Sequence, residues 1–346
     1  MLKKDITSTL YDRADGKDIF LITLRNGMAT IRVTNIGCSI ISIDTPDREG
    51  IFKNIVAGFA DPLDYLHNPW YFGCIVGRYV NRIGNGMYHL EGQTVRLSRN
   101  EGSNHLHGGF EGFHKKIWEM KELVDGDRAV SLLFEYTSPD GEEGYPGNLK
   151  VQMKYSLFEC NRLELCYTAV TDKPTPVNLS NHSYFNLTGF DSLSILDHRI
   201  MINAVGYTEK NGQNLPTGNI LSLEGTPLDL TGSVRLGDRV DKNSFDKGFD
   251  HNYVLGRVGP AAEVYDPFSG RVLRVLTDRP GIQLYTANWW DGSVRGSHDM
   301  PYQQHGAFAL ETQAFPDSPN RPEFPNTILA PGELYSTRTI YEFDIK

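Results

Sequence analysis

The sequence predicts an all-β protein, a large antiparallel β-sandwich, and three observations support this fold class. Apolar and polar residues alternate with a period of two over many segments, as in sheets that have one wet face. Turn-forming stretches such as LRNGM, HLEGQ and DPFSG separate these segments, and 34 glycines and 18 prolines are available for the turns. Few segments show the apolar periodicity of a helix. A sandwich or barrel is therefore expected rather than an α/β fold.

The alternating segments give the expected strands in chain order. They are 19–24, 28–36, 87–97, 129–136, 149–157, 162–170, 271–277, 282–288 and 334–343. A hairpin is expected at 155–164, with Cys160 and Asn161 near its turn, and short helical turns at 61–66 and 236–240. Similar strands run from end to end with no Ser/Gly linker, so we expect residues 1–346 to form a single domain.

Composition limits the classes of partner. The net charge of −9 argues against nucleic acid and anionic membranes, which both need basic patches. No segment approaches the ~18–20 apolar residues of a membrane helix, and no apolar stretch follows Lys3 and Lys4 as in a secretory signal. Asn178, Asn181 and Asn186 begin N-x-S/T sequences within a candidate functional stretch, where glycans would block it. We therefore expect a cytoplasmic protein, either a monomer or a homodimer.

The stretch NHSYFNLTG (181–189) places polar residues at the end of the strand-like run VNLSN. Buried polar side chains must find hydrogen-bond partners, either one another or a ligand. His182 and Tyr184 lie on one face of this stretch. A histidine in such a place is often a satisfied structural residue, so both interpretations stay open.

Two further polar stretches precede it. GRYVNRIGNG (77–86) holds two arginines and two asparagines among glycines, but it lacks the lysine of a P-loop, and a solvated loop is an alternative. In NHLHGG, His105 and His107 have spacing that would suit metal ligands, yet no third ligand follows at motif spacing. No metal is therefore expected, and His114 is expected at the surface.

Glu311 is the strongest single-residue anomaly, because it interrupts the apolar strand FALET, where a carboxylate is rarely placed without a partner. Asp250 precedes the apolar strand of FDHNYVL, although an aspartate there can also be a turn residue. Gln283 lies within IQLYTAN. Carboxylate and imidazole side chains are suited to proton transfer, and amides beside aromatic rings are suited to sugars.

Taken together, the chain resembles the aldose 1-epimerases of the galactose mutarotase family. The matching stretches are GRYVNRIGNG, NHLHGGFEGFHKKIW, EGYPGNL, VNLSNHSYFNLTG, FDHNYVL, GIQLYTAN and LETQAFPDSPN. They come in the family's order and span roughly residues 20–345. The resemblance implies a supersandwich with an open sugar-binding cleft, no metal and no organic cofactor, and a reaction that interconverts the anomers of a free aldohexose such as galactose or glucose.

The resemblance also implies roles for single residues. His182 corresponds to the family's general acid and Glu311 to its general base. His107 corresponds to a histidine at the sugar ring, and Tyr184 to the aromatic neighbour of the acid. The side chains that hold hydroxyl groups in the family correspond to Asn81, Arg82, Asp250 and Gln283, whereas a direct contact from Arg78 is more doubtful. For this chemistry we expect an ionised Glu311 and a protonated His182.

Three other functions stay open. A glycoside hydrolase needs two carboxylates, for which Asp250 is the possible second. A sugar-binding module would not need Glu311 opposite a histidine, and a hexose-phosphate epimerase would need a phosphate site, for which Arg78 and Arg295 are candidates. The stretch ANWWDGSVRG departs from the family pattern, so Trp289 and Trp290 could alter the rim of the cleft and the preferred sugar.

Overall fold

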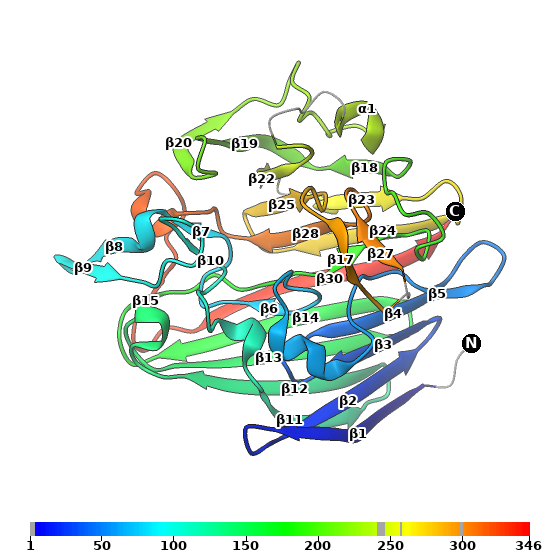
Figure 1. Ribbon diagram of the computed structural model, residues 1–346, viewed down its shortest axis with the longest axis horizontal. Coiled ribbons are helices and arrows are strands. Elements are labelled where there is room, and N and C mark those ends of the chain that lie inside the picture. The colour runs from blue at the N-terminus through cyan, green and yellow to red at the C-terminus, as the bar shows by residue number, and fades with distance from the viewer. Residues whose placement is uncertain (1–3, 241–245, 257, 298–299) are drawn as a thin grey trace.

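Three antiparallel sheets dominate the computed structural model, which describes residues 4–240, 246–256, 258–297 and 300–346. The largest sheet has the strand order β11 (Glu119–Asp125), β12 (Ala129–Ser138), β13 (Leu149–Phe158), β14 (Arg162–Thr171), β30 (Tyr335–Ile345), β24 (Arg271–Thr277), β23 (Ala262–Tyr265), β18 (Arg199–Ile202) and β21 (Val234–Arg235). Two smaller sheets lie against it (Figure 1).

The first smaller sheet has five strands in chain order: β1 (Asp5–Ala14), β2 (Lys17–Asn26), β3 (Ala29–Thr34), β4 (Ile40–Pro46) and β5 (Phe52–Asn54). The second has six strands in the order β17 (Tyr184–Phe185), β28 (Phe308–Gln313), β25 (Gly281–Tyr285), β22 (Asp250–Leu255), β19 (Ala204–Lys210) and β20 (Pro216–Leu221). The six-stranded sheet is the one that carries the candidate site.

Short elements connect the sheets. Two-stranded pairs are formed by β6 (Ile75–Val76) with β16 (Ser180–Asn181), β7 (Arg82–Ile83) with β10 (His105–Leu106), β8 (Met87–Leu90) with β9 (Gln93–Arg96), β15 (Thr175–Pro176) with β29 (Ile328–Leu329), and β26 (Asp291–Arg295) with β27 (Pro301–Gln303). The helical turns are η1 (Pro62–His67), η2 (Gly84–Gly86), η3 (Phe113–Lys115), η4 (Glu142–Gly144), α1 (Leu236–Val240) and η5 (Ser318–Asn320).

The main core fills the space between the nine-stranded sheet and the two smaller sheets. Ile22 and Ile31 of the five-stranded sheet belong to the same buried cluster as Leu132 of the nine-stranded sheet. Leu284 and Leu310 of the six-stranded sheet belong to this cluster as well. Burial of so much apolar surface provides the main driving force for the fold. The opposite face of the six-stranded sheet carries polar side chains such as Glu311 beside a second buried cluster that includes Tyr184 and Ala309.

The expected all-β class is confirmed, and most of the expected strands are present. The segment 87–97 is a hairpin rather than one strand, because Glu91 and Gly92 form its turn with φ of 50° and 77°. The expected hairpin at 155–164 joins β13 to β14, with Asn161 at φ 56°. The expected helical turn at 61–66 is the 3₁₀ helix η1, and the one at 236–240 is α1.

Within the described residues, no helix has the length and apolar character needed to cross a membrane. The side chains of Asn178, Asn181 and Asn186 are at most 2% exposed. They also donate hydrogen bonds to backbone carbonyls, for example from Asn186 Nδ2 to the oxygen of Gly306 at 2.9 Å. These amides are therefore structural, and a glycan on any of them is incompatible with this packing.

Candidate active site

The floor of the candidate site is the outer face of the six-stranded sheet. Leu310 of β28 points into the main core, so the period of two turns Glu311 to the opposite face. Gln283 of β25 lies directly opposite Glu311 in the register, and Asn252 of β22 lies directly opposite Gln283. Strands that each supply one polar residue thus build a row of polar side chains across the sheet.

His182 approaches this row from the bend between β16 and β17. Its Nε2 lies 3.5 Å from Oε1 of Glu311, and the two residues are 3% and 2% exposed. Nδ1 of His182 and Oε2 of Glu311 are buried and have no hydrogen-bond partner among the described residues. Buried polar atoms without partners are rare in folded proteins. The pair is therefore arranged for a ligand that supplies the missing partners.

Burial controls the protonation of this pair. It raises the pKa of Glu311 to about 8, with a further increase from the Asp250 carboxylate that Arg82 partly offsets. Burial also lowers the pKa of His182 to about 4, although Asp250 opposes this. The expectation of an ionised Glu311 beside a protonated His182 is therefore wrong for the unliganded site. Removal of each group from water favours its neutral form.

His107 follows β10 and completes one wall. Its ring centroid lies 5.3 Å from that of His182. The backbone N–H of Asn81 donates to Nδ1 of His107 at 3.2 Å, and the backbone N–H of His107 donates to the oxygen of Asn81 at 3.2 Å. Burial holds the pKa of His107 well below its usual value, so the ring is neutral. With Nδ1 occupied as an acceptor, the proton of the neutral ring is on Nε2, which makes that atom a donor.

This tautomer bears on whether the site fits a metal ion. His107, His182 and Glu311 each offer a ligand atom, and these atoms lie within 4.8 Å of one another. Two histidines and a glutamate also match a known zinc donor set. However, a metal on Nε2 of His107 requires a proton on Nδ1, where the N–H of Asn81 already donates. The donor set therefore fits a metal poorly, and it fits a hydroxyl-rich ligand better.

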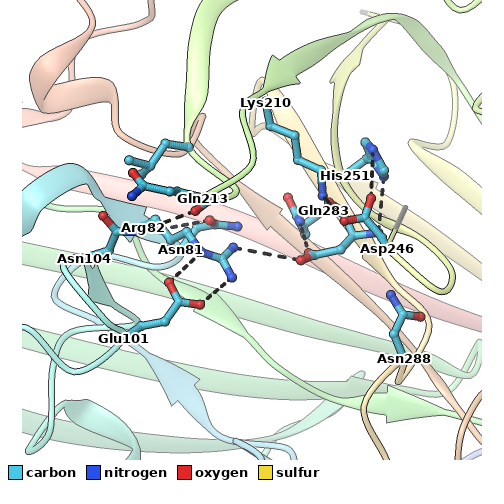
Figure 2. A network of polar contacts seen from close by, with 12 residues as sticks. Asn81, Arg82, Glu101, Asn104, Lys210, Gln213, Asp246, His251, Gln283 and Asn288 are labelled. Atoms are coloured by element: carbon cyan, nitrogen blue, oxygen red, sulfur yellow. Dashed lines mark hydrogen bonds and ion pairs between the residues drawn. The ribbon is translucent and has the colours of Figure 1, made fainter. Parts of the chain in front are cut away.

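Arg82 lies between Glu101 and the polar side chains of the six-stranded sheet (Figure 2). Its guanidinium donates to both carboxylate oxygens of Glu101, at 2.8 Å and 2.6 Å, and Nη1 lies 4.0 Å from Oδ2 of Asp250. Nε2 of Gln283 donates to Oδ1 of Asp250 at 2.6 Å. Although burial opposes ionisation, Arg82 and Lys210 hold the pKa of Asp250 below its usual value. Asp250 is therefore an ionised acceptor beside a fixed donor.

Lys210 fixes the start of the strand that carries Asp250. Its Nζ donates to Oδ1 of Asp246 at 2.9 Å and to the backbone oxygen of Asp250 at 2.7 Å. Nε2 of His251 lies 3.5 Å from the second oxygen of Asp246. Figure 2 shows Lys210, Asp246 and His251 together at one end of the network. A shallow recess is lined by Lys210 and Asp250 on one side and by Asn81 and Arg82 on the other.

The structure brings together every residue that the sequence predicted for the site. Direct contacts or cross-strand pairing connect Glu311, His182, His107, Asn81, Arg82, Asp250 and Gln283, and the ring of Tyr184 lies 4.8 Å from that of His182. Arg78 is outside this group. It is 2% exposed and donates to Ser138 and to the carbonyls of Ser138, Pro139 and Gly147, so it is structural.

His114 and the pair Trp289 and Trp290 lie around the site. His114 was expected at the surface, but it is 3% exposed because the turn of η3 folds it under the ring of Tyr71. Of the tryptophan pair, Trp290 is buried behind the site with its ring 4.9 Å from that of Tyr184. Trp289 is 56% exposed, and Nζ of Lys247 lies 4.4 Å from the centre of its ring.

Sequence reasoning missed four residues of the site: Tyr71, Glu101, Lys210 and Tyr285. Tyr285 could have been found, because it lies two residues after Gln283 in a strand and so shares its face. Register places it directly opposite Asp250. Glu101, Lys210 and Tyr71 come from turns or from a strand end. Their sequence contexts carry no periodic signal that would indicate their partners.

Comparisons with known proteins agree with this geometry. A family model described as "Aldose 1-epimerase" matches residues 21–342. A pig (Sus scrofa) protein named "Galactose mutarotase" is 41% identical over 325 residues, which cover 93% of each chain. "Aldose 1-epimerase" of Escherichia coli (strain K12) is 36% identical over 340 residues, which cover 95% of this chain and 96% of the relative. The crystal structure of a galactose 1-epimerase from Lactobacillus acidophilus superimposes with a TM-score of 0.88 at 27% identity and covers 99% of both chains.

Proposed function

Because this chain belongs to the aldose 1-epimerase family and interconverts the α and β anomers of aldoses, we propose that Glu311 and His182 carry out the proton transfers of that reaction. One observation carries the assignment: a carboxylate and an imidazole lie 3.5 Å apart, both buried, on the polar face of the six-stranded sheet. Groups that transfer protons must lie within hydrogen-bond reach of the reacting atoms. Each member of this pair also has a free polar atom.

The reaction opens and recloses the sugar ring. Glu311 removes the proton from the hydroxyl on C1 while His182 donates a proton to the ring oxygen, and the C1–O bond breaks. The open aldehyde turns about the C1–C2 bond. The ring then recloses with the two roles reversed: Glu311 returns its proton to the oxygen on C1, and His182 takes its proton back from the ring oxygen. Each positioned proton transfer contributes roughly 10²–10⁴ in rate.

The pair needs one proton in total for this chemistry. With one pKa near 4 and the other near 8, the pair holds a single proton at neutral pH. In the unliganded site that proton is on Glu311. Moving it to His182 gives the carboxylate and imidazolium that open the ring, without any exchange of protons with solvent. The reactive form is thus a tautomer of the resting form.

The remaining polar groups hold the sugar hydroxyls. Arg82 is fixed as a donor by Glu101, and Asp250 is fixed as an acceptor by Gln283. The neutral imidazole of His107 donates its Nε2–H toward the region of the sugar's ring oxygen. Preorganised donors and acceptors of this kind lose little entropy on binding. We propose an aldohexose such as galactose as the substrate, since relatives such as the pig protein are named galactose mutarotases.

The pH dependence of kcat/KM follows from the two pKa values. The rate should fall below about pH 4, where the pair gains a second proton, and above about pH 8, where it loses its only one. The limbs of a kcat/KM profile report the free enzyme. Polarimetry of galactose over about pH 3 to 10, corrected for the spontaneous reaction, measures this. A flat profile, with no fall in rate on the acid side or on the alkaline side, would contradict the acid–base pair.

Polarimetry on freshly dissolved α-galactose and α-glucose tests the function itself. The protein is expected to speed the approach to the anomeric equilibrium. Release of an aglycone from an aryl galactoside or glucoside would instead support the glycoside hydrolase. Binding without acceleration would support the sugar-binding module. A phosphate site at Arg78 is disfavoured, because that guanidinium is buried and already bonded to carbonyl oxygens. Rates for galactose, glucose, xylose and arabinose would define the preferred sugar.

A further inference from the structure

Tyr71 occupies a central place among the histidines of the site. Its ring is stacked on that of His182, with centroids 5.9 Å apart and an angle of 23° between the planes. The same ring lies 4.7 Å from that of His107 and 4.6 Å from that of His114. Nothing in the proposed proton transfers accounts for this tyrosine.

The backbone holds Tyr71 in place. The turn between η1 and β6 is fixed by Asn68, whose side chain accepts from the N–H of Phe72 at 2.8 Å and donates to the oxygen of Phe72 at 2.9 Å. The N–H of Tyr71 donates to the oxygen of Asn68 at 3.3 Å, and Sγ of Cys74 donates to the oxygen of Tyr71 at 3.2 Å. Tyr71 itself has φ of 59°, in the left-handed region. The direction of the ring is thus determined locally.

A second tyrosine contacts the same imidazole. The ring of Tyr184 lies 4.8 Å from that of His182 with an angle of 35°. The imidazole of His182 therefore lies close to two tyrosine rings. Aromatic rings carry negative charge on their faces and attract a cation within ~6 Å of the centroid. Both distances fall within this range.

The other groups around His182 differ in whether they can stabilise a positively charged imidazolium. The titratable and charged groups that face it are Glu311, Asp250, His107, His114, Cys74, Tyr71 and Tyr184. Burial keeps the histidines and the thiol neutral, so they give an imidazolium no countercharge. The anions are Glu311, when it is ionised, and Asp250. The aromatic faces of Tyr71 and Tyr184 add to the stabilisation that these two anions give the imidazolium.

We propose that Tyr71 is a positioning residue for the general acid: its ring fixes the imidazole of His182 and favours its protonated form. This inference rests on the function proposed above, because it concerns the reactive tautomer of the Glu311–His182 pair. Without the aromatic face, that tautomer is less populated at every pH. The resting tautomer, in which His182 is neutral, is unaffected.

Comparison of Tyr71→Leu with Tyr71→Phe tests the proposal, because phenylalanine keeps the aromatic face and leucine removes it. Tyr71→Leu is expected to lower the plateau of kcat/KM for galactose about tenfold. The acid limb should move about one pH unit lower, since the doubly protonated pair also contains the imidazolium. The alkaline limb should stay in place, because deprotonation of the resting form leaves His182 neutral. Tyr71→Phe should behave like the wild type.

Two results would overturn the proposal. One is a folded Tyr71→Leu protein with the wild-type plateau and acid limb, and the other is a Tyr71→Phe protein that loses as much as Tyr71→Leu.

Thermal unfolding checks the fold, and Tyr11→Leu on exposed β1 is a control that should change neither the rate nor the limbs of the pH profile. If wild-type protein failed to speed mutarotation, the proposed function would fail instead. NMR titration of His182 in Tyr71→Leu reads the same effect independently of turnover.

Discussion

Glu311→Gln is expected to lower kcat by about 10²–10⁴-fold while the affinity for galactose changes only a few-fold. Glutamine has nearly the shape of the glutamic acid and can make similar hydrogen bonds, but it cannot accept the proton of the C1 hydroxyl. Since the carboxyl is protonated in the resting site, the neutral amide should fit without loss of stability. Initial polarimetric rates with galactose, together with calorimetric binding, measure the two quantities.

The same variant has a second expected signature. Because the folded pKa of Glu311 lies above its unfolded value, the stability linked to its proton is present at low pH and is lost as the pH rises through about 8. Glu311→Gln should not show this loss. The exposed variant Glu224→Gln is a matched control for the change of residue type. A Glu311→Gln protein that keeps more than about a tenth of the rate would contradict the base assignment.

His182→Asn is expected to be nearly as damaging, with a loss of roughly 10²-fold or more. Asparagine cannot deliver a proton to the ring oxygen, and its shorter side chain no longer reaches the position of Nε2, 3.5 Å from Glu311. The variant should also lose the acid limb of the pH profile, since that limb belongs to the pair. The rates are measured by polarimetry, as for Glu311→Gln.

The control for this variant is His67→Asn, which changes an exposed histidine at the end of η1 and should leave the rate unchanged. The smaller side chain at position 182 leaves a gap next to two tyrosine rings. Thermal unfolding is therefore needed to exclude a loss of fold. A folded His182→Asn protein with wild-type kcat would show that another group supplies the proton.

The fold could be predicted wherever the chain forms long alternating strands. The segments that became β12, β13 and β14 follow a period of two closely, because one face of each strand is buried in the core. Shorter strands such as β18 and β21 have too few residues for a period to be visible. Their pairing depends on register, which is set by contacts distant in sequence.

The candidate site was predictable in part. Glu311 was found because a carboxylate within an apolar strand is anomalous, and His182 because polar residues follow a strand-like run. Tyr71 and Lys210 were not found, since Tyr71 lies in a turn and Lys210 at the end of β19, and only the folded chain brings them to the site. The protonation of the pair was predicted wrongly. Ordinary pKa values do not include the desolvation of both groups, which depends on how deeply the fold buries them.

The central claim is that Glu311 and His182 act on one sugar as a unit, and a double-mutant cycle tests it most directly. Polarimetric rates with galactose are needed for the wild type, Glu311→Gln, His182→Asn and the double variant. If the two proton transfers belong to one event, removal of the second group costs little once the first is absent. The double variant should then be about as slow as the slower single variant. Losses that multiply in the double variant would show that the two side chains act independently, and the account would be wrong.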